Sequence, residues 1–257
     1  MSPRPQPIAD LLPEWTWFLD AVISHRPQQG TACEAWTVRD VVAHNAGNAE
    51  ELARILRAHL EGGPVPATRT FEEREAPFHR LSDADLLDAL EEQVSALAAV
   101  LSEAADADTE EFVSWTGRKM KVAWFAEHMR EELVLHRWDI VGDDEASTRL
   151  LDQPWMTEHS VVAVGQPLLR KGLSRLPAGR RVTARLRSEG RDDVVITAGE
   201  DSAVIELAPP EGPAVLETDP AARVLLLWGR QPADPARIYS EAGSTALGEA
   251  RLLLSGY

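Results

Sequence analysis

Apolar residues in the first part of the chain recur at intervals of three and four, a spacing that is typical of helices with one buried face. We expect such helices over residues 8–25, 37–59, 82–103 and 120–141. Pro13 lacks an amide N–H, so it lies near the start of the first helix or delays that start to about residue 13. Four helices with apolar faces predict an up-and-down bundle.

Short polar side chains mark where the predicted helices begin. Thr37 precedes an apolar run and Asp40 stands three residues later, a carboxylate variant of the capping box. Ser82 opens the third helix in a similar way. Residues 61–80 and 105–119 show no helical period, and we predict that both are loops.

The periodicity changes in the second part of the chain. After a further expected helix over residues 155–172, apolar and polar positions alternate, as in half-buried strands. We expect strands over 182–187, 194–197 and 203–207, a turn at 199–201, a short strand from Val215, a helix from about Thr218 to Trp228, and a last helix over 244–254. These elements predict a small antiparallel sheet with helices, an α+β unit.

Side-chain composition also divides the chain. Residues 1–159 contain 14 basic and 30 acidic side chains, whereas residues 160–257 contain 12 of each. All seven histidines and seven of the eight tryptophans lie in the first part. We therefore predict an α+β protein of two domains, a helical bundle over residues 1–155 and the small α+β domain over residues 156–257.

The composition excludes several classes of partner. A net charge of −16 argues against nucleic acid, because phosphate binding needs clustered basic residues. No apolar run reaches the ~18 residues of a membrane span, so we expect no membrane partner. The first 15 residues lack the apolar core of a signal peptide. A single cysteine, Cys33, excludes an internal disulfide, and we expect a cytoplasmic protein whose oligomeric state is left open.

Three residues on two predicted helices form a candidate metal site. Glu132 and His136 stand four residues apart, and positions i and i+4 lie on one face of a helix. Such a pair is common by chance, but His44 on another helix of the bundle can supply a third ligand. Two nitrogens and one carboxylate oxygen suit zinc or another divalent ion, and three protein ligands leave a position open for chemistry.

Other residues near this pair fit the site less well. His128 and His136 are separated by ~12 Å of helix rise, too far for one shared ion. Glu131 is rotated by roughly 100° from Glu132 and should miss the site. Asp40 or Asp139 can hold the second ring nitrogen of a ligand histidine, although Asp40 also fits as a helix-entry residue.

Two segments carry a resemblance to a known family. The segment WTVRDVVAHNAG around His44, and the stretch from Gly117 to REELVLHRWDI, resemble the mycothiol-dependent maleylpyruvate isomerase family. That family belongs to the DinB-like metal-binding four-helix bundles. The resemblance also implies a smaller α+β second domain that is similar to sterol carrier protein folds, to which the strand-rich tail and the segment LLLWGR correspond.

The resemblance implies an enzyme that uses a zinc-type site of His44, Glu132 and His136 together with the thiol mycothiol. The substrate would be a small electrophile, and the reaction either a maleylpyruvate-type cis–trans isomerisation or a thiol S-transfer. The metal motifs do not separate these two reactions. A metal can stabilise an external thiolate at neutral pH, so Cys33 is not required.

Two alternative functions stay open. A metal-dependent hydrolase would use metal-bound water, with Glu131 or Glu127 as base. A non-catalytic binding or regulatory module could keep the same fold and metal. A dicarboxylate substrate would need an arginine. The resemblance points to Arg230 as this catalytic residue, with Arg80, Arg118 and Arg137 as alternatives.

Overall fold

The computed structural model describes residues 8–105, 110–116, 118–199, 202–240 and 244–254. The chain forms two compact units, which divide between Val141 and Gly142. Gly142 has a φ of 78°, a left-handed conformation that suits the residue after a helix end. Among the described residues, no helix is both long and apolar enough to cross a membrane.

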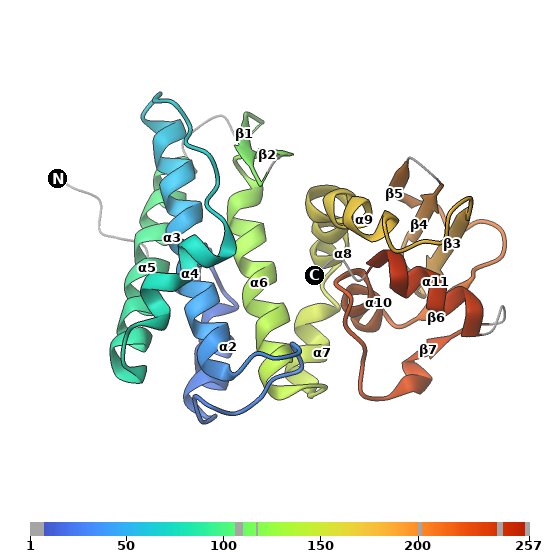
Figure 1. Cartoon of the computed structure of the whole chain (residues 1–257), viewed down its shortest axis with the longest axis horizontal. Helices are drawn as coiled ribbons and strands as arrows, with labels where there is room; N and C mark the ends of the chain where they lie inside the picture. The colour runs from blue at the N-terminus through green and yellow to red at the C-terminus, as the bar shows by residue number, and fades with distance from the viewer. Residues whose placement is uncertain (1–7, 106–109, 117, 200–201, 241–243, 255–257) are drawn as a thin grey trace. The chain divides into compact units, whose positions relative to one another are not determined.

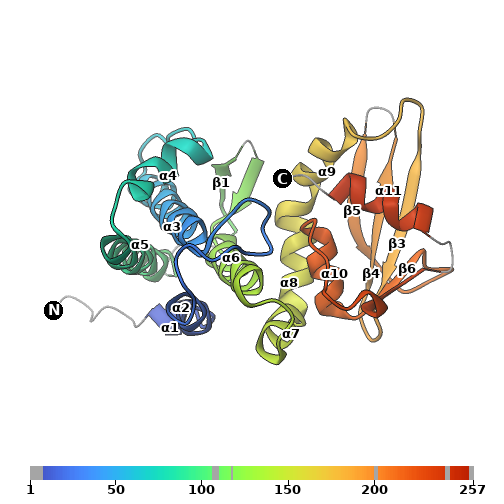
Figure 2. The same cartoon turned by 60° about the horizontal axis from the view of Figure 1, so that its bottom comes forward.

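The first unit is a helical bundle, as predicted. Its main helices are α2 (Trp15–Ile23), α3 (Val38–Leu60), α5 (Asp83–Ala104) and α6 (Trp124–Val141). The central helix α3 packs against α5 and α6, while α2 packs against α6 (Figures 1 and 2). Their facing side chains form one apolar core that includes Phe18, Leu52, Leu90, Leu97, Phe125 and Leu133.

The helix starts follow the predicted caps. Thr37 accepts a hydrogen bond from the amide of Asp40, and the Asp40 carboxylate accepts one from the amide of Thr37, which confirms the capping box at α3. Ser82 caps α5 in the predicted way. The expected helix over 8–25 is broken at Pro13 into α1 (Ile8–Leu11) and α2, because proline cannot continue the helical hydrogen bonds.

The sequence predicts a loop over residues 61–80. The structure differs, because helix α4 (Phe71–His79) forms within this range. Thr70 and Glu73 make a second capping box at its start. The helix packs closely on α3 at Gly47, where an added Cβ would lie 2.9 Å from the carbonyl oxygen of Arg74. Glycine therefore permits the approach of the two backbones.

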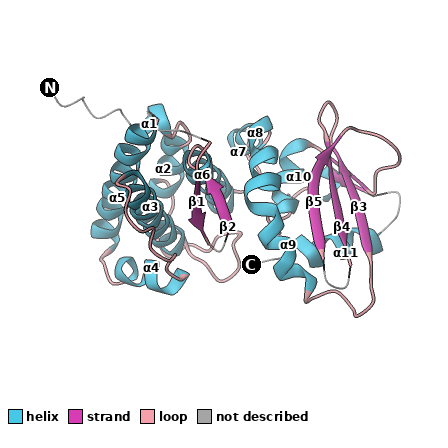
Figure 3. Cartoon of the chain, turned by 90° about the horizontal axis from the view of Figure 1, so that it is seen from above, coloured by secondary structure: helices cyan, strands magenta, loops and turns pink. Residues whose placement is uncertain are grey.

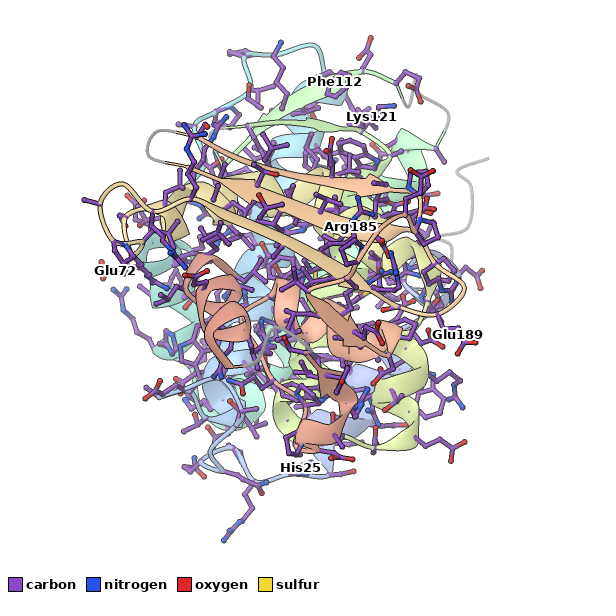
Figure 4. All side chains as sticks on the ribbon, turned by 90° about the vertical axis from the view of Figure 1, so that its right-hand side faces the viewer. His25, Glu72, Phe112, Lys121, Arg185 and Glu189 are labelled. Atoms are coloured by element: carbon purple, nitrogen blue, oxygen red, sulfur yellow. The ribbon has the colours of Figure 1, made fainter. Side chains whose placement is uncertain are left out.

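Residues 105–119 also contain regular structure that the periodicity did not predict. Strands β1 (Phe112–Trp115) and β2 (Arg118–Lys121) form an antiparallel pair in which Phe112 faces Lys121 (Figure 4). The Nζ atom of Lys121 lies 5.9 Å from the centre of the Phe112 ring. Because β2 takes up residues to Lys121, α6 begins at Trp124 rather than at the predicted Met120.

The second unit contains a five-stranded sheet in the order β5-β4-β3-β6-β7. Its strands are β3 (Val182–Arg187), β4 (Asp193–Ala198), β5 (Ala203–Ala208), β6 (Leu216–Thr218) and β7 (Ile238–Tyr239). Neighbours are antiparallel except β3 and β6, which are parallel. The three predicted strands are confirmed, while the predicted turn at 199–201 lies partly outside the described residues.

Helices in the second unit lie against one face of this sheet (Figure 3). The helical elements are α7 (Glu145–Leu151), α8 (Pro154–His159), a π-helical stretch (Ser160–Gly165), α9 (Gln166–Leu173), α10 (Pro220–Leu227), a 3-10 turn (Pro235–Arg237) and α11 (Ser244–Leu254). Helix α9 packs against β5, and α11 packs against β3. Helix α7 packs against α10, and both helices belong to the unit from Gly142.

Candidate metal centre

The structure brings together the three residues that the sequence singled out as metal ligands. His44 comes from α3, while Glu132 and His136 come from successive turns of α6. One possible ligand atom of each residue lies within 4.8 Å of the others. The Nε2 atom of His136 is 3.2 Å from Oε2 of Glu132, and the Nε2 atom of His44 is 3.5 Å from the same oxygen.

All three residues are buried in the bundle. Their exposed fractions, taken over the whole residue, are 5% for His44, 8% for Glu132 and 4% for His136. The two imidazole rings meet edge to face, with centroids 4.9 Å apart. A buried carboxylate between two imidazoles is costly unless it is paired, and here each imidazole directs a nitrogen at it.

Each histidine of the cluster is oriented by a second carboxylate. The Nδ1 atom of His136 lies 2.8 Å from Oδ2 of Asp139, the contact that the sequence suggested. The Nδ1 atom of His44 lies 2.7 Å from Oε1 of Glu75 on α4. Asp40, the other suggested partner, instead completes the capping box at Thr37. Because both Nδ1 atoms are held by carboxylates, both Nε2 atoms are left to face Glu132.

Two aromatic side chains cover the cluster. The indole of Trp36 stacks on the ring of His136 at 5.8 Å, and it lies 5.0 Å from the ring of His44. Phe71 also contacts His44, with ring centroids 5.6 Å apart. The loop before Trp36 is attached to the end of α6, because the amide of Ala32 donates to the carbonyl of Asp139 at 2.7 Å.

Charge interactions within the cluster shift two pKa values in opposite directions. Burial lowers the pKa of His44, but hydrogen bonds to Glu132 and Glu75 outweigh it and hold that pKa above its usual value. Burial raises the pKa of Glu132, yet its contacts with His136 and His44 hold the pKa well below the usual range. The carboxylate is therefore ionised at neutral pH.

The donor set fits a divalent cation. Two imidazole nitrogens and one ionised carboxylate oxygen are a ligand set found in zinc enzymes, and their close spacing suits one ion. The carboxylates on both Nδ1 atoms fix the histidine tautomers in the form that ligation by Nε2 needs. His128 lies near the other carboxylate oxygen of Glu132, with its Nε2 atom 3.6 Å from Oε1.

The predicted arginines occupy different places. Arg230 lies in the second unit, after Gly229, and lines a pocket with Arg251. Arg80 is exposed at the end of α4, Arg118 is half-buried on β2, and Arg137 is buried on α6. The role of Arg230 stays a prediction. Other residues around its pocket are Leu226, Gly229, Gln231, Gly248 and Leu252.

Sequence reasoning missed Glu75 and Trp36 as parts of the site. A loop over residues 61–80 does not predict a place for Glu75 at the site. The signal that would have placed it is Thr70 followed by Glu73, a capping pattern that predicts a helix there. Trp36 was read only as part of a helix entry. Nothing in its local pattern shows that its ring lies on His136, because that contact joins distant segments.

Comparison with solved structures shows a shared fold. The crystal structure of a histidine-to-alanine mutant of the mycothiol-dependent maleylpyruvate isomerase matches with a TM-score of 0.62 at 17% identity, covering 93% of this chain and 95% of that chain. The crystal structure of that isomerase without the mutation matches with a TM-score of 0.61 at 18% identity and the same coverage. No curated protein matches the sequence.

A family model matches the helical bundle. The model described as the mycothiol maleylpyruvate isomerase N-terminal domain matches residues 9–141, more than half of the chain. This range contains α2 to α6 and all three residues of the candidate metal centre. The chain therefore belongs to the mycothiol maleylpyruvate isomerase N-terminal domain family.

Proposed function

We propose that this protein is a metal-dependent enzyme that uses mycothiol to act on a small electrophile. One observation carries the proposal: the Nε2 atoms of two buried histidines converge on the carboxylate of Glu132, and each histidine has its Nδ1 atom held by a second carboxylate. The family to which the chain belongs supports the thiol.

The chain's own residues prepare the site for this chemistry. His44, Glu132 and His136 would hold the ion, which when bound stabilises a thiolate at neutral pH. Glu75 and Asp139 keep the two imidazoles in a ligating orientation. Trp36 and Phe71 cover the histidines, and they limit the access of water to the cluster.

The proposed reaction on the electrophile is either isomerisation or S-transfer of the thiol. The solved structures with the same fold are of a mycothiol-dependent maleylpyruvate isomerase, which makes a cis-enedioate the first substrate to test. Isomerisation leaves the thiol unconsumed, whereas transfer consumes one thiol for each product. The ratio of thiol consumed to product formed therefore separates the two reactions.

The geometry gives less support to a hydrolase. A metal-bound water would need a nearby carboxylate as base. Glu75 and Asp139, the carboxylates that contact the two histidines, are each hydrogen-bonded to an imidazole Nδ1 atom. Both are therefore engaged in orienting ligands.

The first test is the metal content of variants. Replacement of His44, Glu132 or His136 by alanine should remove most of the bound zinc from the purified chain. His128→Ala is the matched control, because His128 lies one turn from Glu132 on the same helix but outside the proposed ligand set. Full zinc retention in His44→Ala would contradict the proposed ligands.

The second test is the thiol requirement. Maleylpyruvate should turn over only when both zinc and mycothiol are present, and Cys33→Ala should leave the rate nearly unchanged. Steady turnover with zinc and no thiol would contradict the thiol dependence and favour a hydrolase.

A further inference from the structure

A buried arginine lies beside the metal centre and is not part of the proposed ligand set. Arg74 on α4 is only 4% exposed. Its Nη1 atom donates to Oδ1 of Asn48 at 3.2 Å. Its guanidinium carbon lies 4.3 Å from the centre of the Phe71 ring and 5.9 Å from that of Trp115. The guanidinium therefore contacts an amide and two aromatic rings.

Two of these neighbours carry a buried hydrogen-bond donor that has no acceptor within the described part of the chain. Asn48 is 2% exposed and its Nδ2 atom has no hydrogen-bond partner there; the same holds for Nε1 of Trp115, which is 1% exposed. Since Oδ1 of Asn48 accepts from Arg74, the amide is oriented with Nδ2 as its remaining donor. Buried donors are nearly always satisfied in proteins, so this pair points to a missing acceptor.

Asn48, Phe71 and Trp115 connect Arg74 to the proposed metal centre. Asn48 follows His44 by four residues on α3, and so it lies on the same helix face one turn further on. Phe71 contacts both the ring of His44 and the guanidinium of Arg74. The ring of Trp115 lies 6.0 Å from that of His128, whose Nε2 atom is 3.6 Å from Glu132.

We infer that Arg74, Asn48 and Trp115 form an anion subsite that binds a carboxylate of the electrophile beside the metal centre. A guanidinium, an amide N–H and an indole N–H are donors, and a carboxylate is acceptor-only, with about four lone-pair sites. Arginine also forms short, charge-assisted bonds to carboxylates. This inference rests on the proposed function, and it narrows the substrates to electrophiles with a carboxylate.

Phe71 is an exposed residue that lies over both Arg74 and His44. Its side chain is 44% exposed although its ring covers both Arg74 and His44. It is the first residue of α4 and directly follows the loop over 61–70. Because its ring contacts both groups, a change of its side-chain rotamer would uncover the guanidinium of Arg74 and the ring of His44 together.

The other arginines near α4 are engaged differently. Arg54 and Arg69 each bind the carboxylate of Glu51, which is fully buried. Burial raises the pKa of Glu51, but these hydrogen bonds outweigh it and hold the pKa at about 2. Arg80, one of the arginines that the sequence suggested, is exposed at the end of the helix. Of these arginines on or beside α4, Arg74 is the one that faces Asn48 and Phe71.

The experiment measures binding of maleate, a simple cis-enedioate, to the full zinc-loaded chain by calorimetry. Arg74→Met should weaken maleate binding by about 10- to 100-fold, because a charge-assisted hydrogen-bond donor is lost. Arg57→Met, at an exposed position of α3, is the control and should bind maleate like the wild type. Dimethyl maleate, which has no charge, should show no difference between the wild type and Arg74→Met.

Further variants keep the result decisive. Zinc content and thermal unfolding are measured for each variant, and if Arg74→Met does not fold, Arg74→Lys decides, since lysine keeps the charge but loses the planar fork. Arg74→Lys should also bind maleate more weakly than the wild type. Unchanged maleate binding in the Arg74 variants, or no maleate binding by the zinc-loaded wild type, overturns the subsite.

Failure of the subsite and failure of the proposed function are separable. Zinc bound with normal thiol-dependent turnover, but with equal maleate affinity in wild type and Arg74→Met, would reject only the subsite. Maleate binding that depends on Arg74 in a chain that needs no thiol for turnover would reject only the thiol-dependent function.

Discussion

At the scale of single residues, the ring nitrogens of His44 and His136 have separate tasks. In each ring, Nδ1 contacts a carboxylate, Glu75 or Asp139, while Nε2 faces Glu132. A carboxylate on Nδ1 fixes the orientation of the ring and raises the basicity of the other nitrogen. In the proposed metal site the ligands are therefore arranged before ion binding, which would lower the entropy lost on binding.

The first prediction concerns these carboxylates. Glu75→Gln and Asp139→Asn should each weaken zinc binding by about 10- to 100-fold, because the histidine loses its orienting acceptor. Competition with a coloured chelator measures the change. Glu72→Gln is the control, since Glu72 is exposed on the same helix as Glu75 (Figure 4). Equal zinc affinity in all three variants would contradict an orienting role.

The second prediction concerns stability of the metal-free protein. The pKa of His44 is raised on folding, so its contribution is present below pH 6.5 and is lost as pH rises through the raised pKa. The pKa of Glu132 is lowered, so its contribution is present above pH 4.5 and is lost as pH falls through the lowered pKa. The pair should therefore stabilise the fold most between these two pH values.

Chemical unfolding with chelator present tests this pH dependence. The stability difference between the wild type and His44→Gln should be largest between pH 4.5 and 6.5 and should shrink at higher pH. His25→Gln serves as control, because its ring contacts the backbone carbonyl of Ala21 rather than a carboxylate. A difference that grows above pH 6.5 would reverse the assigned sign.

At the scale of elements, the short helix α4 supplies three of the side chains around the candidate metal centre. It carries Glu75 to His44, and Arg74 and Phe71 to the neighbouring subsite. Its position depends on the close approach to α3 at Gly47. A single packing contact between two helices thus supports both an orienting carboxylate and the candidate anion contacts.

The third prediction tests this contact with Gly47→Ala. Alanine by itself favours a helix by about 1 kcal/mol over glycine, but the new Cβ would lie 2.9 Å from the carbonyl oxygen of Arg74. Because this neighbour is backbone, α4 must move, and overpacking of this kind costs ~1–3 kcal/mol. We expect a lower free energy of unfolding, measured with urea, and weaker zinc binding.

A matched substitution separates this effect from a general one. An added Cβ at Gly63 would lie 3.5 Å from the Ala58 carbonyl, an ordinary contact, so Gly63→Ala should leave zinc affinity unchanged. If Gly47→Ala also binds zinc like the wild type, the position of Glu75 does not depend on the helix contact.

At the scale of the whole molecule, the two compact units have different character. The unit up to Val141 contains the candidate metal centre, and the unit from Gly142 contains the sheet and Arg230. The fourth prediction is that residues 1–141 expressed alone form a helical fold that binds zinc. Circular dichroism and elemental analysis measure this. An unfolded fragment without zinc would show that the bundle requires the rest of the chain.

The fifth prediction assigns a catalytic role to Arg230. Arg230→Met should lower thiol-dependent turnover of maleylpyruvate by at least about tenfold while zinc content stays the same, because a charged donor to the substrate is lost. Steady-state kinetics and metal analysis measure both. Arg180→Met is the control, since Arg180 pairs with Glu249 on the surface. Normal turnover in Arg230→Met would contradict a catalytic role for Arg230.

The amino-acid sequence by itself determined the main helices, three strands and the candidate ligand triad. Period and capping are local properties, so Thr37 and Ser82 placed the starts of α3 and α5 correctly. The spacing of Glu132 and His136 is also local, because a helix places i and i+4 on one face. His44 could be added because a bundle brings helix faces together.

Only the tertiary structure decided which side chains complete the site. Glu75 holds His44 from a helix that lies 31 residues further along the chain, and Trp36 covers both histidines. Asp40 could have held His44, but the cap of its own helix engages it instead. Such contacts depend on how separate segments pack, and local spacing contains no information about which of several carboxylates or aromatic rings arrives at a given nitrogen.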